Sequence, residues 1–264
     1  IVATGANIVD QDFFEGLGFR HYKGDVRADD DLLRRNAIDR IYDTYIDEDQ
    51  LRECDMTVAK IADEMLAAGG PRAVSSRDFI REMGAWLAKN RPNSRSIVRA
   101  AYTMDVPIFV PAFSDCSAGF GLVHHQVHHP DGYIALDSAA DFRELTEMKL
   151  KAGRTGLFMV GGGVPKNFAQ DVVVAAEVLG HEAEMHRYAV QLTVADERDG
   201  ALSGSTLREA NSWGKVQLGE EQMVFGEATV TLPLVAAYAY HRGAWRARTE
   251  HRYAKLFDKE ALKP

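Results

Sequence analysis

The sequence alternates short apolar runs with segments of helical periodicity, and this order limits the fold more than any other feature. The expected strands cover residues 1–4, 106–113, 155–160, 188–195 and 221–230. The expected helices between and after them cover residues 30–47, 55–67, 79–89, 142–153, 165–180 and 232–257. Alternating strands and helices bury most apolar surface as a mostly parallel sheet with helices on both faces. We therefore predict an α/β fold of Rossmann-like type, with one domain over residues 1–264.

The composition is that of a globular protein with a sizeable core, because 46% of the residues are hydrophobic and 27% are charged. The net charge of −8 argues against a nucleic-acid partner and suits a cationic one. Every apolar run is shorter than the roughly 18 residues of a membrane helix. Only Cys54 and Cys116 occur, which predicts a reducing, cytoplasmic setting without a disulfide. The strand-like run at Ile1 suggests that the chain starts inside a longer protein.

Three glycines follow the apolar run that ends at Val160, and a helical pattern begins directly after them. Gly161, Gly162 and Gly163 would let the backbone approach a phosphate, which the N–H groups of the helix N-terminus would bind. Lys166 could neutralise that phosphate. The alternatives are a tight strand-to-helix turn and a solvated lysine, and this pattern alone leaves them open.

Two further segments carry small or polar residues after an expected strand. The first contains Thr4, Gly5, Ala6 and Asn7, and the second contains Asp115 and Ser117. Ligands of α/β folds bind at the carboxyl ends of strands, so these residues could line a dinucleotide. Asp115 could hold a ribose hydroxyl or a cationic substrate. A plain turn at residues 4–7 and a helix cap at Asp115 are the alternatives.

Four histidines lie in the segment HHQVHH, residues 124–129. His124 and His128, like His125 and His129, are four residues apart, a spacing that suits zinc on a helix. An obvious third ligand and the HExxH pattern are both missing from the sequence. We therefore predict polar or interface histidines and no metal site.

The segment EANSWGKVQLG, residues 209–219, places Lys215 in an unusual setting for a lysine. Glu209 lies six residues before it and could bind an amine, while Trp213 could exclude water. A lysine attacks as a nucleophile only without its proton, so burial or neighbouring cations must lower its ordinary pKa of about 10.4. Imine chemistry at Lys215 is one reading. The other is an ordinary lysine at a helix end.

Together these segments resemble the deoxyhypusine synthase family over nearly the whole chain. The matching segments are TGAN at 4–7, PAFSDCSAG at 111–119, LFMVGGGVPKN at 157–167, YAVQLT at 188–193, DGALSGSTLREANSWGK at 199–215 and FGEATVTLPLV at 225–235. The combination of SWGK with an upstream GGGVPK is the most specific part of the resemblance.

The resemblance implies an NAD-dependent transferase with a Rossmann-like fold, assembled as a homotetramer with active sites between subunits. In this family NAD oxidises spermidine, and a lysine captures the aminobutyl group as an imine while 1,3-diaminopropane leaves. The acceptor amine is a lysine of a translation factor in deoxyhypusine synthase and putrescine in related homospermidine synthases. We therefore expect NAD as the cofactor, a polyamine such as spermidine or putrescine as the substrate, and a protein lysine or a diamine as the acceptor.

Matching positions assign a role to each candidate residue. The resemblance makes Lys215 the imine-forming lysine and places Glu209, Trp213, Lys166 and Asn167 in the substrate pocket. The positions that match NAD contacts are Thr4, Gly5, Ala6, Asn7, Asp115, Ser117, Gly161, Gly162, Gly163, Asp199, Gly226 and Glu227.

The chain departs from the eukaryotic pattern at three positions. Phe120 and Leu202 replace acids that would pair with substrate ammonium groups, and Asn167 replaces a histidine. The ALSGST loop looks more like prokaryotic members, which favours a small-amine acceptor. A family NAD-binding loop is expected upstream of residue 1. Two alternatives follow: an enzyme acting on another amine, and a non-catalytic homologue that serves as a binding protein.

Overall fold

The computed structural model describes residues 1–257. It divides into two compact units. The first consists of Ile1 and residues 3–141, and the second consists of Val2 and the residues from 142 onward. Each unit is described by itself. The expected single domain over residues 1–264 stays a prediction, because two compact units can belong to one domain.

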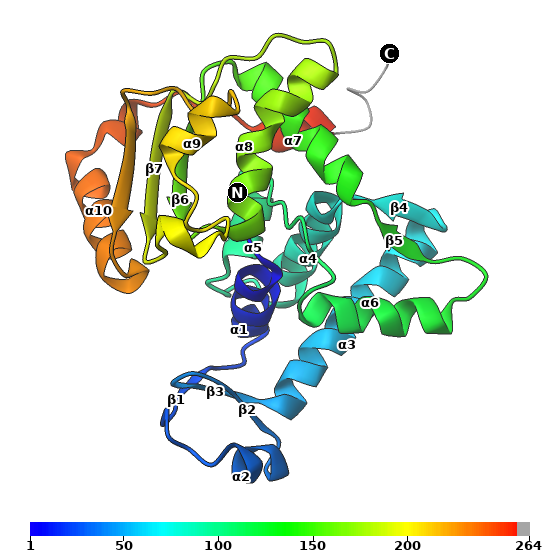
Figure 1. Ribbon diagram of the computed structural model, residues 1–264. Coiled ribbons are helices and arrows are strands. Elements are labelled where there is room, and N and C mark those ends of the chain that lie inside the picture. The colour runs from blue at the N-terminus through cyan, green and yellow to red at the C-terminus, as the bar shows by residue number, and fades with distance from the viewer. Residues whose placement is uncertain (258–264) are drawn as a thin grey trace. The chain divides into compact units, whose positions relative to one another are not determined.

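The first unit is mainly helical, with two small sheets (Figure 1). A π-helical segment at Ala6–Phe13 leads into α1. The helices are α1 (Phe14–Gly16), α2 (Asp30–Arg35), α3 (Glu48–Gly69), α4 (Ser76–Asn90), α5 (Ile97–Met104), α6 (Ser117–His128) and the start of α7 (Ser138–Ala152). The strands are β1 (Tyr22–Lys23), β2 (Ile38–Ile41), β3 (Thr44–Asp47), β4 (Arg72–Val74) and β5 (Ile134–Leu136).

The core of the first unit lies between paired helices, α3 against α6 and α4 against α5. Phe13, Ile61, Phe79 and Met83 are fully or almost fully buried there. The α3–α6 crossing is close, because a Cβ atom at Gly121 would lie 2.4 Å from the carbonyl oxygen of Asp55. Parallel strands β4 and β5 pair beside this core.

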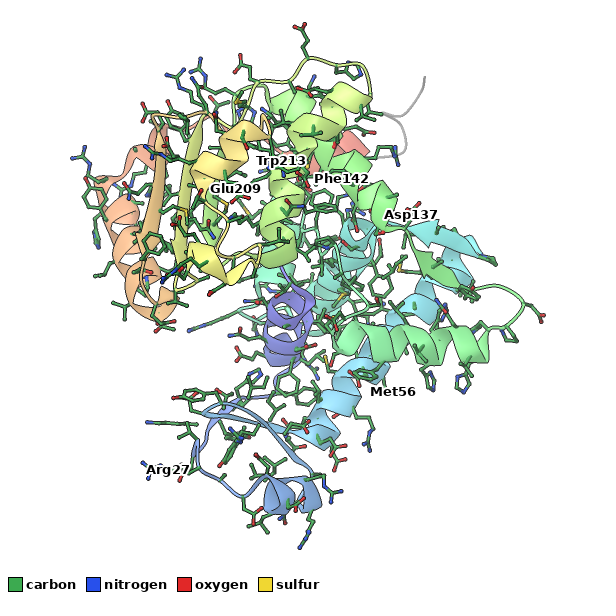
Figure 2. All side chains as sticks on the ribbon, viewed as in Figure 1. Arg27, Met56, Asp137, Phe142, Glu209 and Trp213 are labelled. Atoms are coloured by element: carbon green, nitrogen blue, oxygen red, sulfur yellow. The ribbon has the colours of Figure 1, made fainter. Side chains whose placement is uncertain are left out.

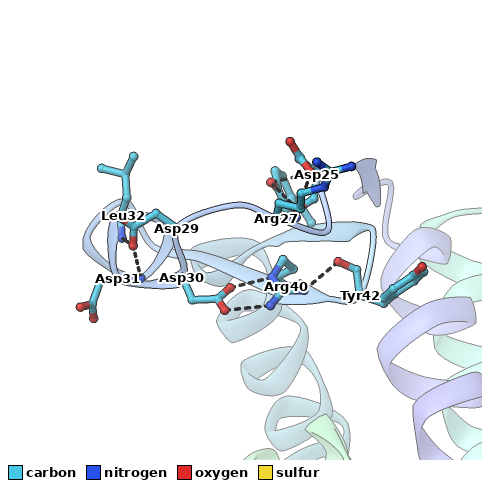
Figure 3. A network of polar contacts seen from close by, with 9 residues as sticks. Asp25, Arg27, Asp29, Asp30, Asp31, Leu32, Arg40 and Tyr42 are labelled. Carbon is cyan, nitrogen blue, oxygen red and sulfur yellow. Dashed lines mark hydrogen bonds and ion pairs between the residues drawn. The ribbon is translucent and has the colours of Figure 1, made fainter.

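The helix expected over residues 30–47 is wrong. Helix α2 ends at Arg35, and β2 and β3 then form an antiparallel sheet with β1 in the order β1-β3-β2. Arg40 binds both carboxylate oxygens of Asp30, at 2.6 and 2.8 Å, and donates to the carbonyl of Tyr42 at 2.9 Å (Figure 3). The Asp29 side chain caps α2. This hairpin makes an antiparallel sheet that helical spacing alone could not predict.

Two expected strands of the first unit are also wrong. Residues 1–4 and 106–113 form extended backbone and turns, held by bonds such as Ala3 N–H to Phe109 O at 3.0 Å. Pro107 and Pro111 lack the N–H groups that a longer ladder would need. Helix α4 begins with a side-chain cap, because the Ser75 hydroxyl accepts from the Asp78 N–H at 3.1 Å.

The second unit contains a three-stranded parallel sheet in the order β6-β7-β8. Its strands are β6 (Gly156–Val160), β7 (Tyr188–Thr193) and β8 (Glu221–Phe225), and its helices are the rest of α7, α8 (Gly163–Val178), α9 (Leu207–Ser212) and α10 (Ala228–Arg242). Short 3₁₀ turns lie at Glu197–Asp199, Ala244–Ala247 and Tyr253–Phe257. Figure 1 shows α10 on one face of the sheet and α8 and α9 on the other.

The predicted class, α/β with parallel strands, is confirmed. The Rossmann-like form stays a prediction, because the parallel strands of the described residues belong to separate sheets of two and three strands. The final elements differ in length from the expected ones. Strand β8 ends at Phe225, since Glu227 caps α10 through a bond from the Thr229 N–H, and Gly243 ends that helix with φ 72°. The expected strand over 221–230 and helix over 232–257 are therefore corrected to 221–225 and 228–242.

Within residues 1–257, we find no helix with both the length and the apolar character to cross a membrane.

Candidate functional site

The glycine turn lies where predicted, between β6 and α8. Gly161 and Gly163 have φ values of 71° and 72°, which other residues rarely adopt. A Cβ atom at Gly162 would lie 2.5 Å from the Cα of Ser203, so this glycine closely approaches a protein loop. Among residues 1–257 no side chain caps α8 at Gly162, which leaves the first N–H groups of the helix available to an anion.

The other predicted cofactor residues of the second unit follow β7 and β8. Because the strands are parallel, their carboxyl ends share the edge that carries the glycine turn. Asp199 accepts from the Asp196 N–H at 3.2 Å in a capping box. The Glu227 carboxylate accepts from the Thr229 N–H at 2.8 Å, and its bonds to Thr229 lower its pKa. Both acids therefore already form hydrogen bonds at a helix start, and their cofactor role stays a prediction.

The predicted cofactor residues of the first unit lie side by side at its 4–7 and 115–117 segments. A Cβ atom at Gly5 would lie 2.4 Å from Cys116 Sγ, so only glycine fits there without movement. The Thr4 hydroxyl donates to Asn7 Oδ1 at 2.7 Å, while Asp115 and Ala6 are exposed. The structure thus brings together two segments that are far apart in the chain.

Ser117 is buried at the start of α6 rather than open to a ligand. Its N–H donates to Asp10 Oδ1 at 2.8 Å. Burial raises the pKa of Asp10, and the bonds from Ser117 partly oppose that rise. Cys116 and Cys54 are free thiols, as predicted, and burial raises the pKa of Cys116 to about 12. The cysteines are therefore poor nucleophiles.

Lys215 lies in the turn after α9, and hydrogen bonds hold its backbone at the start of β7. Its carbonyl accepts from the His186 N–H at 2.9 Å, and Val216 forms a parallel bridge with His186. The His186 ring is buried between Thr155 Oγ1 at 2.9 Å and the Ala169 carbonyl at 3.1 Å. Burial lowers the pKa of His186 to about 4, so this ring is neutral and structural.

The ammonium group of Lys215 lies against α8. Its Nζ is 2.5 Å from Asp171 Oδ1 and 3.3 Å from Asn167 Oδ1. The Trp213 ring centroid is 5.1 Å from Nζ, within cation–π range. Trp213 is 65% exposed, so the expected exclusion of water by its ring stays a prediction. In Figure 2 Glu209 and Trp213 are labelled at α9 and the turn that follows it.

Lys166 also lies on α8, but its ammonium group is used within the protein. Nζ donates to Ser205 O at 2.5 Å, Ser205 Oγ at 3.0 Å and Leu202 O at 3.1 Å. Burial lowers the pKa of Lys166 to about 8. The negative charge of Glu209 opposes this decrease, and the positive charge of Lys215 adds to it. Three acceptors match the three N–H bonds of an ammonium group, so Lys166 clamps the 202–205 loop. Its predicted contact with substrate stays a prediction.

The two positions where the resemblance implies lost acids are open to solvent. Phe120 on α6 is 70% exposed, and Leu202 before α9 is 40% exposed. An acid at either position would keep much of its side chain in water, so its charge would not be fully buried. A change to an acid can therefore be accommodated at either place.

The histidine segment forms α6, and its buried member is held by hydrogen bonds. Asp63, His125 and His129 bring three possible metal ligands within 4.8 Å of one another. His125 Nε2 accepts from the Ile134 N–H at 3.0 Å, so a neutral ring carries its proton on Nδ1, which lies 2.6 Å from Asp63. Hydrogen bonding therefore accounts for the contact between His125 and Asp63, and the expected absence of a metal site stays a prediction.

Sequence reasoning missed Asp171 and His186. Asp171 lies four residues after Asn167, so both point from the same face of α8. That spacing was the available signal for a carboxylate beside Lys215. His186 lies in an irregular segment before β7 and gave no periodic signal.

A sequence model described as deoxyhypusine synthase matches residues 1–239. The "Deoxyhypusine synthase-like protein" of Chlorobaculum parvum is 63% identical over 259 residues, which cover 98% of this chain and 73% of that protein. The "Probable deoxyhypusine synthase 2" of Methanosarcina mazei is 40% identical over 259 residues, 97% of this chain and 72% of that protein.

A crystal structure of a deoxyhypusine synthase candidate from Entamoeba histolytica is similar to this chain, with a TM-score of 0.50 and 15% identity. The match covers 78% of this chain and spans 59% of that structure, and it bears on the fold alone. The family match and the two sequence relatives cover almost all of the segments that form the glycine turn and the Lys215 site. The chain belongs to the deoxyhypusine synthase family.

Proposed function

We propose that the protein is an NAD-dependent transferase that moves the aminobutyl group of a polyamine to an acceptor amine through an imine on Lys215. The observation that carries this proposal is the setting of Lys215 Nζ, which is largely buried between Asp171, Asn167 and the Trp213 ring. Carboxylate, amide oxygen and aromatic face all attract ammonium groups. A set of groups of this kind suits an aliphatic polycation.

The residues present fit a dinucleotide at the carboxyl edge of the β6-β7-β8 sheet. The uncapped N-terminus of α8 and the glycine turn would hold a phosphate. Among residues 1–257, Gln191 Oε1 is buried without a hydrogen-bond partner, and its Nε2 donates to Gly161 O at 2.8 Å. This places a free acceptor beside the glycine turn. Bound NAD would supply the hydride acceptor, and later the hydride donor, that this chemistry requires.

The roles of the chain's own residues follow from their contacts. Lys215, as a neutral amine, would attack the electrophilic carbon of the oxidised substrate, and the leaving amine would take a proton. Asn167 would orient Nζ through its amide oxygen. Glu209 is exposed on α9 and would attract the cationic substrate. Lys166 would hold the 202–205 loop in place.

The acceptor is proposed to be a small diamine or a protein lysine, and the protein is proposed to act as a homotetramer. A different amine substrate is the second candidate. The exposed apolar side chains of Phe120 and Leu202 favour it, because neither can pair with an ammonium group. Product analysis with several amines separates the two.

Substitution of the lysine tests the proposal. Lys215→Arg keeps the positive charge but removes imine formation, because a guanidinium stays protonated. We expect transfer to fall by at least about a thousandfold, in the range of lost covalent catalysis. The exposed Lys151 provides the control, and Lys151→Arg should keep full activity. Full transfer by the Lys215→Arg protein would show that another group carries the aminobutyl chain.

A further inference from the structure

Asp171 makes the shortest polar contact of the Lys215 site and uses both carboxylate oxygens. Oδ1 lies 2.5 Å from Lys215 Nζ, and Oδ2 accepts from Asn167 Nδ2 at 2.6 Å. Asn167 Oδ1 in turn lies 3.3 Å from the same Nζ. The side chains of Lys215 and Asp171 are only 11% and 28% exposed. The three side chains form a closed ring of polar contacts on one face of α8.

This ring favours the charged form of Lys215. A carboxylate at contact distance stabilises an ammonium group, and more so when the pair is partly buried. The Trp213 ring favours the cation as well, while the nearby cation of Lys166 opposes it. An ammonium group has no lone pair and cannot attack carbon. The arrangement therefore holds the proposed nucleophile in its unreactive form.

We propose that Asp171 keeps Lys215 protonated in the resting enzyme and releases it when an ammonium group of the amine substrate takes its place at the carboxylate. This inference rests on the proposed function, because it concerns the same lysine. Asp171 is a positioning residue. Its carboxylate pairs first with Lys215 and then with the ammonium group of the substrate.

The exchange balances in protons and charge. The substrate arrives as a polycation, and one of its ammonium groups binds Asp171. Two adjacent cations cannot share one carboxylate favourably, so Lys215 loses its proton to solvent and keeps its lone pair. One carboxylate and one cation remain at the ring before and after the exchange. Substrate binding thereby produces the amine that attacks the substrate.

Calorimetry of diamine binding without NAD tests the exchange directly. Putrescine is titrated at pH 8 into the whole protein in two buffers of different ionisation enthalpy, which measures the protons released. We expect the wild type to release roughly 0.5 to 1 proton per bound diamine. Asp171→Asn, which keeps the shape and removes the charge, should release almost none. Asp171→Glu should restore release.

Trace labelling with acetic anhydride, read at Lys215 by peptide mass spectrometry, tests the resting state. At pH 8 we expect Asp171→Asn to raise the labelling rate of Lys215 about tenfold, the effect of losing one 1.4 kcal/mol interaction. Glu177 is exposed on the same helix, so Glu177→Gln loses the same charge away from the site and should leave the rate unchanged. Equal labelling of the wild-type and Asp171→Asn proteins would overturn the first half of the proposal.

The outcomes separate this inference from the proposed function. Proton release without transfer would leave the inference standing and remove the transferase. Transfer by a wild type that binds putrescine without proton release would overturn the inference alone. Putrescine that does not bind, or releases equal numbers of protons from the wild-type and Asp171→Asn proteins, would also overturn the exchange at Asp171.

Discussion

At the residue scale, two buried lysines of the second unit lie in different surroundings. Lys166 and Lys215 are 4% and 9% exposed, and each has polar contacts at Nζ. Three oxygens of the 202–205 loop accept hydrogen bonds from Lys166 Nζ. Lys215 meets one carboxylate, one amide oxygen and an exposed ring, all of which could instead bind a cationic substrate. The contacts of Lys166 are thus those of a structural clamp, while the catalytic role of Lys215 stays a proposal.

Restoring carboxylates tests the specificity of the site at the same scale. We expect Phe120→Asp and Leu202→Asp each to tighten spermidine binding about tenfold, because each acid can pair with an ammonium group. Both side chains are exposed, so the substitutions should be tolerated. Val178 is 82% exposed at the end of α8, and Val178→Asp controls for a general gain of negative charge. Unchanged spermidine affinity, measured by calorimetry, would show that positions 120 and 202 do not face the substrate.

At the scale of elements, the turn between β6 and α8 depends on a loop that lies far along the chain. Gly162 contacts Ser203, and Gln191 on β7 donates to the carbonyls of Gly161 and Ser203 at 2.8 and 3.0 Å. The loop that Lys166 clamps therefore also supports the glycine turn. The proposed cofactor edge and the 202–205 loop are linked through these contacts within one unit.

A methyl group at the turn tests this support. Gly162→Ala places Cβ 2.5 Å from the Ser203 backbone, so the two segments must separate. We expect a loss of about 1–3 kcal/mol in the free energy of unfolding and a marked loss of NAD affinity. Gly153 has φ 64° and open space at Cβ, so Gly153→Ala should cause backbone strain of about 1 kcal/mol and leave NAD affinity intact. Equal NAD affinity in the Gly162→Ala and wild-type proteins would place the cofactor elsewhere.

At the scale of the whole molecule, the pH dependence of stability follows from His186. Burial lowers its pKa to about 4, against about 6.5 in the unfolded chain. The unfolded state then binds more protons at this group between these values, so the contribution of His186 to stability is complete above pH 6.5 and is lost as the pH decreases toward 4. The decrease amounts to at most about 3 kcal/mol.

Denaturation with urea at pH 7, 6 and 5 measures this dependence. The wild type should lose stability steadily over this range. His186→Gln keeps polar groups but does not titrate, so we expect a less stable protein with a smaller dependence on pH. A pH dependence in His186→Gln equal to that of the wild type would show that other groups cause the acid loss.

The sequence predicted the second unit better than the first. The strands at 155–160 and 188–195, the glycine turn and the helix after it depend on local patterns, and they lie close to where they were expected. The 30–47 segment carried helical spacing but folds into α2, β2 and β3, because the ion pair of Arg40 with Asp30 and the pairing of β2 with β3 outweigh that spacing. The spacing of Asn167 and Asp171 places both on one face of α8, but the sequence does not show that Lys215, 44 residues further along, lies beside Asp171.

The most direct measurement is reductive trapping of the lysine. The protein is incubated with NAD and spermidine or putrescine, treated with borohydride, and its peptides are examined by mass spectrometry. We predict an aminobutyl adduct on Lys215, absent without NAD and absent in Lys215→Arg. An adduct on another lysine, or NAD binding without any adduct from either amine, would contradict transfer through Lys215.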